Sequence, residues 1–204
     1  MLERFLGNFT VTDGTPGGEF AGCGGPLQTV LGELGGCTFE RGLYRVHTES
    51  SAVAATQLVA AAFPEFRSRL SCFAFDWLGR QFATDSGRGV ASDPEVMMFE
   101  PGTGEALEIP VPLSRFHDEE LVDCSEAALA VDFFSDWMSV HRSALDFDHC
   151  AGYRTPLFLG GVDAVSNLEV SDLDVYWTLM GQLRLKALAL PPGTPISEVQ
   201  IEEQ

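Results

Sequence analysis

Two stretches in the first third of the chain carry apolar residues at helical spacing. The first opens at Pro26, which suits a first helical turn, and ends at the glycine pair that begins at Gly35. The second has Thr48 or Ser50 as a candidate cap and ends before Pro64, because a residue that precedes proline disfavours helical backbone. The pattern therefore predicts two short amphipathic helices.

Two further helices are predicted in the second half of the chain. One opens at Asp123, where Glu126 three residues later completes a capping-box pattern. The other opens at Ser171 and ends near Lys186, with acidic residues in its first turn and basic residues in its last, as the helix dipole favours. The helix from Asp123 has a heavy apolar face, which we interpret as a core stripe and not as a cofactor site: Ala127, Ala130, Val131, Phe134, Trp137 and Met138.

The middle of the chain alternates between apolar and polar residues, as strands do. Phe73, Phe75 and Trp77 alternate before a turn at Gly79, and a second pair of alternating segments flanks a turn at residues 102–104. Strands that follow one another through hairpins form an antiparallel sheet, whose apolar face must be covered. We therefore expect an α+β fold: an antiparallel sheet of four or more strands covered by helices, with a C-terminal domain of helices and short strands.

Composition divides the chain into four expected regions. Residues 1–25 are rich in glycine and are expected to form a flexible segment, and residues 191–204 are expected to form an acidic tail interrupted by prolines. Between these ends we expect an antiparallel α+β region at 26–114 and a C-terminal domain at 115–190. The two inner regions are expected to pack together as one compact unit.

The 204-residue chain is strongly acidic, with 30 Asp and Glu residues against 12 Lys and Arg residues and a net charge of −18. Such a surface repels phosphate backbones and anionic lipids, so we expect neither nucleic acid nor a membrane as partner. It favours a basic protein, although acidity also serves solubility alone. The five cysteines are an odd number without a Cys-x-x-Cys pair, which indicates a reducing compartment. Since no apolar run has the length of a membrane span or a signal peptide, we expect a cytoplasmic protein.

Motifs of common enzyme chemistry are absent from the sequence. It has no P-loop, no Gly-x-Ser-x-Gly elbow, no His-Glu-x-x-His zinc motif and no dinucleotide fingerprint. We therefore expect no enzyme, no catalytic residue, no cofactor and no metal. One stretch is dense in possible metal ligands but matches no known spacing, and a metal-dependent hydrolase that uses it is the less favoured alternative: His141, Asp146, Asp148, His149 and Cys150.

Acidic residues are closely spaced just after Phe116. On a helix they would form one charged face beside buried apolar residues. Such a face is usually only solvated. Repulsion between its like charges nevertheless destabilises the protein, and binding of a basic partner would relieve that repulsion. We therefore expect four residues of this run to contribute to a partner interface: Asp118, Glu119, Glu120 and Asp123.

The last third of the chain carries a further set of features: Gly160–Gly161 after a strand, a turn at Asn167–Glu169, the pair Tyr176–Trp177 on a helix, and Gly181–Leu183 at its close. With these features, the segment Pro156–Leu183 resembles the C-terminal domain of type VI secretion immunity proteins that neutralise DNase toxins. The recognisable domain spans roughly residues 115–190. The overall layout is also similar, more weakly, to SUKH-class immunity proteins.

The resemblance implies a binding protein and supplies no catalytic residues. The residues that carry the resemblance are expected to have structural roles, in turns and in aromatic packing: Gly160, Gly161, Tyr176 and Trp177. The loop between them is expected to add interface residues: Asp163, Asn167 and Glu169. The expected function is that of a cytoplasmic immunity protein that occludes the active site of a basic toxin, expected to be a nuclease. The alternative is an acidic adaptor or scaffold without a toxin partner.

Overall fold

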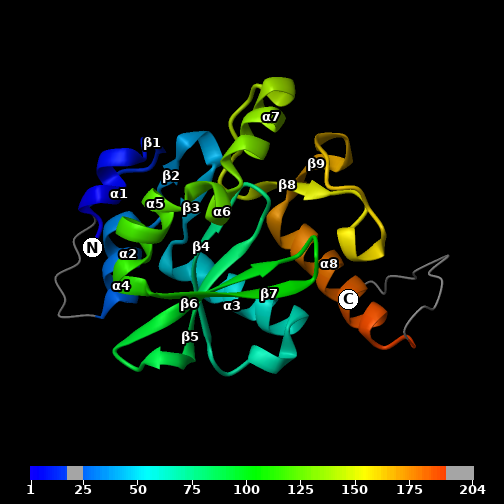
Figure 1. Cartoon of the computed structure of the whole chain (residues 1–204), viewed down its shortest axis with the longest axis horizontal. Helices are drawn as coiled ribbons and strands as arrows, with labels where there is room; N and C mark the ends of the chain where they lie inside the picture. Colours follow the sequence, from blue (N-terminus) through cyan, green and yellow to red (C-terminus); the bar gives the residue numbers. More distant parts are fainter. Residues whose placement is uncertain (18–24, 192–204) are drawn as a thin grey trace.

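A seven-stranded antiparallel sheet forms the centre of the computed structural model, which describes residues 1–17 and 25–191. The strands lie in the order of the sequence, each paired with the next, so the sheet is a meander without crossovers (Figure 1). They are β1 Val11–Asp13, β2 Thr38–Phe39, β3 Tyr44–Val46, β4 Leu70–Asp76, β5 Gln81–Val90, β6 Asp93–Glu100 and β7 Glu105–Pro112.

Side-chain alternation along the strands buries both faces of this sheet. In β6, Val96 and Met98 belong to one hydrophobic cluster, whereas Met97 and Phe99 belong to the other. Successive side chains of a strand point to opposite faces, so each cluster lies on its own side of the sheet. A sheet that is apolar on both faces needs helices on both, and the molecule has three layers.

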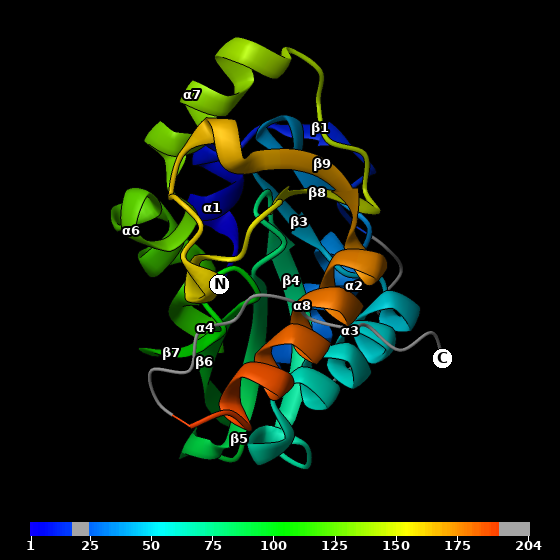
Figure 2. The same cartoon turned by 90° about the vertical axis from the view of Figure 1, so that its right-hand side faces the viewer.

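One face is covered by two long helices that run side by side across it (Figure 2): α3 Glu49–Ala62 and α8 Leu173–Leu188. The side chain of Thr48, one of the two expected caps, accepts a backbone N–H from the first turn of α3. Asp172 does the same for α8, one residue after the expected cap at Ser171. Both helices thus begin where short polar side chains satisfy their free N–H groups.

Shorter helices cover the opposite face. Between β7 and β8 the chain passes through a π-helix, in which each turn holds one residue more than in an α-helix. The helices of this layer are α1 Glu3–Asn8, α2 Pro26–Leu34, α4 Leu113–Arg115, the π-helix Phe116–Glu120, α5 Leu121–Asp123, α6 Ser125–Leu129 and α7 Val131–His141.

A separate two-stranded sheet pairs β8 His149–Tyr153 with β9 Leu168–Asp172 in antiparallel register. It lies beyond one end of the main sheet, beside α7, and directly precedes α8 in the chain (Figure 1). Short 3₁₀ helices complete the described elements, at Glu40–Gly42, Pro64–Phe66, Leu157–Leu159 and Val165–Asn167.

The α+β class expected from the sequence is confirmed, but the single helix expected from Asp123 to Met138 is wrong. The helix breaks at Ala130, whose φ of 51° lies in the left-handed region. Glu126 does not complete a capping box with Asp123, because its carboxylate accepts the Asp132 N–H at the start of α7. Periodicity could not reveal the break, because the apolar stripes of α6 and α7 enter the same cluster.

The N-terminal segment expected to be flexible contains α1 and β1 instead. Phe5 is fully buried, and its ring centroid lies 4.6 Å from that of Phe9 and 4.8 Å from that of Phe39. Burial of two aromatic rings stabilises a short helix that would be marginal alone. Residues 3–13 of the glycine-rich segment 1–25, which we expected to be flexible, thus contain regular secondary structure.

Segments on either side of the expected boundary at residue 115 pack into the same two hydrophobic clusters. The turn between β4 and β5 also joins them through hydrogen bonds: Trp77 Nε1 to the Leu129 oxygen at 2.9 Å, an Arg80 nitrogen to the Ala128 oxygen at 3.0 Å, and Trp177 Nε1 to the Gly79 oxygen at 2.7 Å. Buried indole and guanidinium groups thus find their partners across the boundary. Residues 18–24 and, apart from its first residue, the expected acidic tail lie outside the described residues.

Candidate functional site

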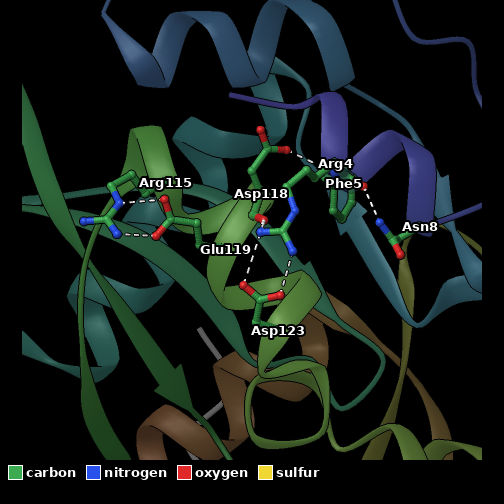
Figure 3. A network of polar contacts seen from close by, with 7 residues as sticks. All are labelled: Arg4, Phe5, Asn8, Arg115, Asp118, Glu119 and Asp123. Carbon is green, nitrogen blue, oxygen red and sulfur yellow. Dashed lines mark hydrogen bonds and ion pairs between the residues drawn. The ribbon is translucent and has the colours of Figure 1, made fainter.

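The acidic run from Asp118 to Asp123 lies against α1, and three of its four carboxylates, those of Asp118, Glu119 and Asp123, point to donors of the chain itself (Figure 3). One oxygen of Asp118 accepts the Phe5 N–H at 3.0 Å, and the other lies 3.3 Å from the amine of Met1. Burial alone would raise the pKa of Asp118, but these donors outweigh it and the pKa lies below its ordinary value. This carboxylate therefore fastens α1 to the π-helix.

Two further carboxylates of the run are held by arginines. Arg4 donates to both oxygens of Asp123, at 2.7 and 3.2 Å, and donates again to the Asp118 carbonyl oxygen at 2.8 Å. Arg115 holds both oxygens of Glu119 in the same way, four residues along the chain. These hydrogen bonds are the main reason that the pKa values of Asp123 and Glu119 lie below their ordinary values. All four side chains are well exposed, so the pairs contribute little to stability.

Most of the formal charge of the run is thus neutralised within the molecule. The sequence could not show this, because Arg4 and Asp123 are 119 residues apart in the chain. Glu120 has no ion pair with any residue that the structure describes. An interface role for the run stays a prediction, but most of the negative charge on which we based it is paired with positive groups of the same chain.

The expected interface residues of the β8–β9 loop also have partners inside the molecule. Asp163 accepts the Tyr153 hydroxyl at 2.6 Å, and Glu169 pairs with Arg154 at 3.1 Å. Asn167 is only 8% exposed and makes three hydrogen bonds with the backbone of its own loop. Its amide therefore braces the loop and is not presented at the surface.

The four residues expected to be architectural lie in tight or buried positions. Gly160 has a φ of 87°, and a Cβ on Gly161 would lie 1.9 Å from the Thr155 carbonyl oxygen. The Tyr176 hydroxyl accepts a backbone N–H of β8 at 3.1 Å, and Trp177 is 1% exposed. These features shape the loop and fix α8 against the strands.

A cleft of about 260 Å³ that the sequence analysis did not anticipate opens between α3, the residues before β8 and the start of α8. Three exposed carboxylates line it, those of Asp148, Asp172 and Asp174. The sequence showed all three, but we interpreted Asp148 as part of a metal-like stretch and the other two as helix-dipole charges. The apolar wall residues are Ala54, Ala55, Leu58, Phe75, Phe147 and Leu173.

The remaining lining of the cleft is a hydrogen-bonded set of His47, Ser51 and Gln81. His47 Nδ1 lies 3.0 Å from Ser51 Oγ, and Nε2 lies 2.8 Å from Gln81 Oε1. Burial lowers the pKa of His47 to about 4, with a smaller contribution in the same direction from Arg45. The ring is therefore neutral at pH 7, and because Gln81 Oε1 only accepts, Nε2 carries the proton.

This serine–histidine pair lacks the properties of a nucleophile and its base. A general base works best with a pKa near the operating pH, and that of His47 lies well below it. The group on the far side of the ring is the neutral amide of Gln81, which stabilises a positive imidazolium less than a carboxylate would. The set lines the cleft without the carboxylate that would orient the imidazole of a catalytic triad.

The stretch with possible metal ligands is dispersed by the fold. His141 stacks on Trp137 with centroids 4.6 Å apart, while His149 Nδ1 lies 2.7 Å from an oxygen of Asp148. Cys150 is buried, which raises the pKa of its thiol to about 12. Within residues 1–17 and 25–191, no three His, Cys, Asp or Glu side chains converge as a metal site would require. In the same part of the chain, no helix has both the length and the apolar character needed to cross a membrane.

Residues 130–184 match the protein family described as "T6SS immunity protein Tdi1, C-terminal". The match confirms the resemblance inferred from the sequence and covers about a quarter of the chain, from the start of α7 into α8. All three carboxylates of the cleft lie inside it. The matched segment is thus similar to the C-terminal domain of such immunity proteins.

No curated protein matches the chain. Among solved structures, Atu4351 from Agrobacterium tumefaciens has a similar fold, with a TM-score of 0.57 and 15% sequence identity over 89% of each chain. At that identity the likeness concerns the fold alone. It extends over most of both chains and is not confined to the matched segment.

Proposed function

We propose that this protein is an immunity protein that binds and neutralises a toxin of a type VI secretion system. The observation that carries the proposal is the match of residues 130–184 to a family of such immunity proteins. An antidote of this kind acts by binding its toxin, so the chain works as a binding protein and not as an enzyme. It works in the cytoplasm, where a toxin that attacks internal targets would have to be stopped.

The charge of the chain supports a basic toxin. At −18 the protein attracts cationic surfaces over distances comparable to the Debye length. A nuclease must hold phosphates and therefore presents such a surface around its active site. We propose that the toxin is a nuclease and that the immunity protein occludes its active site. Electrostatic steering can raise association rates by about 10- to 10³-fold, which suits an antidote that must act before damage.

A protection experiment tests the proposal. The gene beside that of this protein, if it encodes an effector-like product, is expressed in a bacterial host with and without the protein. We expect growth to be restored by co-expression and the two products to co-elute from a sizing column. The association rate should fall steeply between about 50 and 500 mM salt, because the Debye length shortens from about 14 to about 4 Å. Dissociation should change less.

Two outcomes would contradict the proposal. Absence of both protection and complex formation with the neighbouring product would favour an adaptor without a toxin. Retardation of a DNA fragment by the protein itself at ordinary salt would be incompatible with its charge, because an acidic nuclease inhibitor should not bind the substrate of its toxin.

A further inference from the structure

The cleft between α3 and α8 combines a hydrocarbon interior with an anionic mouth. One wall is a stripe of α3, formed by Ala54, Ala55 and Leu58, and half-buried Phe147 faces it from the segment before β8. Its volume of about 260 Å³ is below the ~300–1,000 Å³ of cavities that hold drug-sized ligands. The cleft therefore has the size of a single long side chain, with an apolar stem and a polar end.

The carboxylates at the mouth are less neutralised than those of the run against α1. Asp148 pairs with the imidazole of His149, and Asp172 accepts the backbone N–H of Val175. The carboxylate of Asp174 has no ion pair or hydrogen bond with the residues that the structure describes. Among the residues that the structure describes, no lysine or arginine lines the cleft.

Positive charge near the cleft is smaller than this negative charge. The guanidinium of Arg45 lies 4.4 Å from the Phe75 ring centroid but is fully buried. Its hydrogen bonds go to the carbonyl oxygens of Asp76, Asp146 and His149. The starts of α3 and α8 add roughly half a positive charge each. Three carboxylates exceed these contributions, and the mouth stays anionic.

We propose that this cleft receives an arginine side chain of the toxin and anchors it. The proposal rests on the proposed function for the existence of the toxin, but the recognition chemistry belongs to the cleft alone. The aliphatic stem lies along the α3 stripe, and the guanidinium lies among Asp148, Asp172 and Asp174. A planar guanidinium can donate to two carboxylates at once and stack on the half-buried ring of Phe147, which an ammonium does less well.

Other occupants fit the cleft less well. A metal ion needs several ligands that converge, and no such group of three exists within the described part of the chain. An anion would be drawn to the two helix starts but repelled by three carboxylates at the mouth. A neutral apolar side chain would leave those carboxylates without a partner. The cationic, long-stemmed side chain satisfies both parts of the cleft.

The test uses the whole protein and a small probe, N-acetyl-arginine N-methylamide, followed by two-dimensional NMR. We expect saturable shifts of the Ser51 and Val175 backbone signals and the Gln81 side-chain amide, with affinity in the millimolar range because the probe is small. The neutral isostere made from citrulline should bind about ten-fold more weakly, since it keeps the shape and loses the charge. The lysine derivative should fall between the two.

Matched variants locate the effect. In an Asp148→Asn, Asp174→Asn double variant, which leaves the Asp172 cap in place, affinity for the arginine probe should fall about ten-fold. An Asp132→Asn, Asp136→Asn variant removes the same charge from α7 and should bind as wild type does. Ala54→Phe, at an exposed position of α3, should block the cleft without a change of charge.

Equal binding of the citrulline and arginine probes, shifts that map to another surface, or shifts caused only by inorganic phosphate would each overturn the proposal. None of these outcomes involves a toxin, so they leave the protection experiment unaffected. Conversely, a toxin that binds the cleft double variant and the α7 double variant equally tightly would keep the immunity function and refute the anchor.

Discussion

Two acidic regions of this protein differ in their spacing along the chain and in how far the fold neutralises their carboxylates. The run from Asp118 to Asp123 is the denser one, yet the amine of Met1, Arg4 and Arg115 occupy three of its four carboxylates. The cleft carboxylates are dispersed along the chain and come together only because β8, β9 and α8 meet there, with one imidazole as their ion-pair partner. Local density of acidic residues therefore does not measure surface charge, because arginines distant in sequence decide how much remains.

The largest effect should appear when the apolar residue that packs behind the acidic run is truncated. Phe5→Ala should lower the free energy of unfolding by about 3–5 kcal/mol, because the ring is fully buried among other aromatics and is placed by the Asp118 hydrogen bond. Leu6→Ala, at a 40% exposed position of the same helix, is the control and should cost much less. Denaturant titration measures both. Equal losses would mean that the run does not serve to dock α1.

A buried histidine lies behind each region, and both should make stability depend on pH. Burial lowers the pKa of His47 to about 4 and that of His117 to about 3, whereas an unfolded histidine titrates near 6.5. Below pH 6.5 the unfolded chain therefore binds protons first, and stability is lost as the pH falls from 6.5 towards those values. Above 6.5 the contribution is complete.

At pH 5 each histidine should have removed about 2 kcal/mol of the stability present at pH 7. His117→Phe and His47→Gln should each abolish about half of the combined loss from the two histidines. Denaturant titration at the two pH values would measure it. If one substitution abolished all of it, the other histidine would be solvated and the two regions would differ in their interiors as well.

The smallest expected effect separates the two regions most directly. Asp118→Asn should cost about 1–2 kcal/mol, because the Phe5 N–H loses a charged acceptor at a site with little exposure. Asp174→Asn removes the same charge from an exposed carboxylate without a described partner, and should leave the unfolding midpoint unchanged within error. A midpoint that falls equally in both variants would remove the distinction between a structural and a free carboxylate.

Sequence patterns predicted the elements well wherever a local signal decides the structure. Pro26 and Thr48 start helices as their chemistry predicts, and alternation at Phe73 and Phe75 marks a strand. The pattern failed where distant contacts decide: Ala130 breaks a helix whose apolar stripe continues. The same is true of the site, since Asp148 and Asp174 become neighbours only through the register of β8 with β9.

The resemblance located the segment that the family model matches but indicated no binding surface. Tyr176 and Trp177 are recognisable because packing and turns constrain them, and both are buried. A surface that binds a partner is free of that constraint, and its carboxylates differ little in sequence from those that only solubilise the chain. Asn167, which we expected at the interface, is a polar loop residue that is buried and hydrogen-bonded to the backbone of its own loop, and its interface role stays a prediction.

The chain has three tryptophans, and Trp77, Trp137 and Trp177 are all at most 1% exposed. Two of their indole N–H groups make hydrogen bonds at the β4–β5 turn: that of Trp77 with Leu129, just before the matched segment, and that of Trp177, within it, with Gly79. The intrinsic tryptophan fluorescence of this protein therefore reports on its interior, and through Trp77 and Trp177 on the junction at that turn. A ligand seated at the surface should leave the emission maximum where it is, and a red shift on mixing with a partner would report that the matched segment had loosened from the sheet.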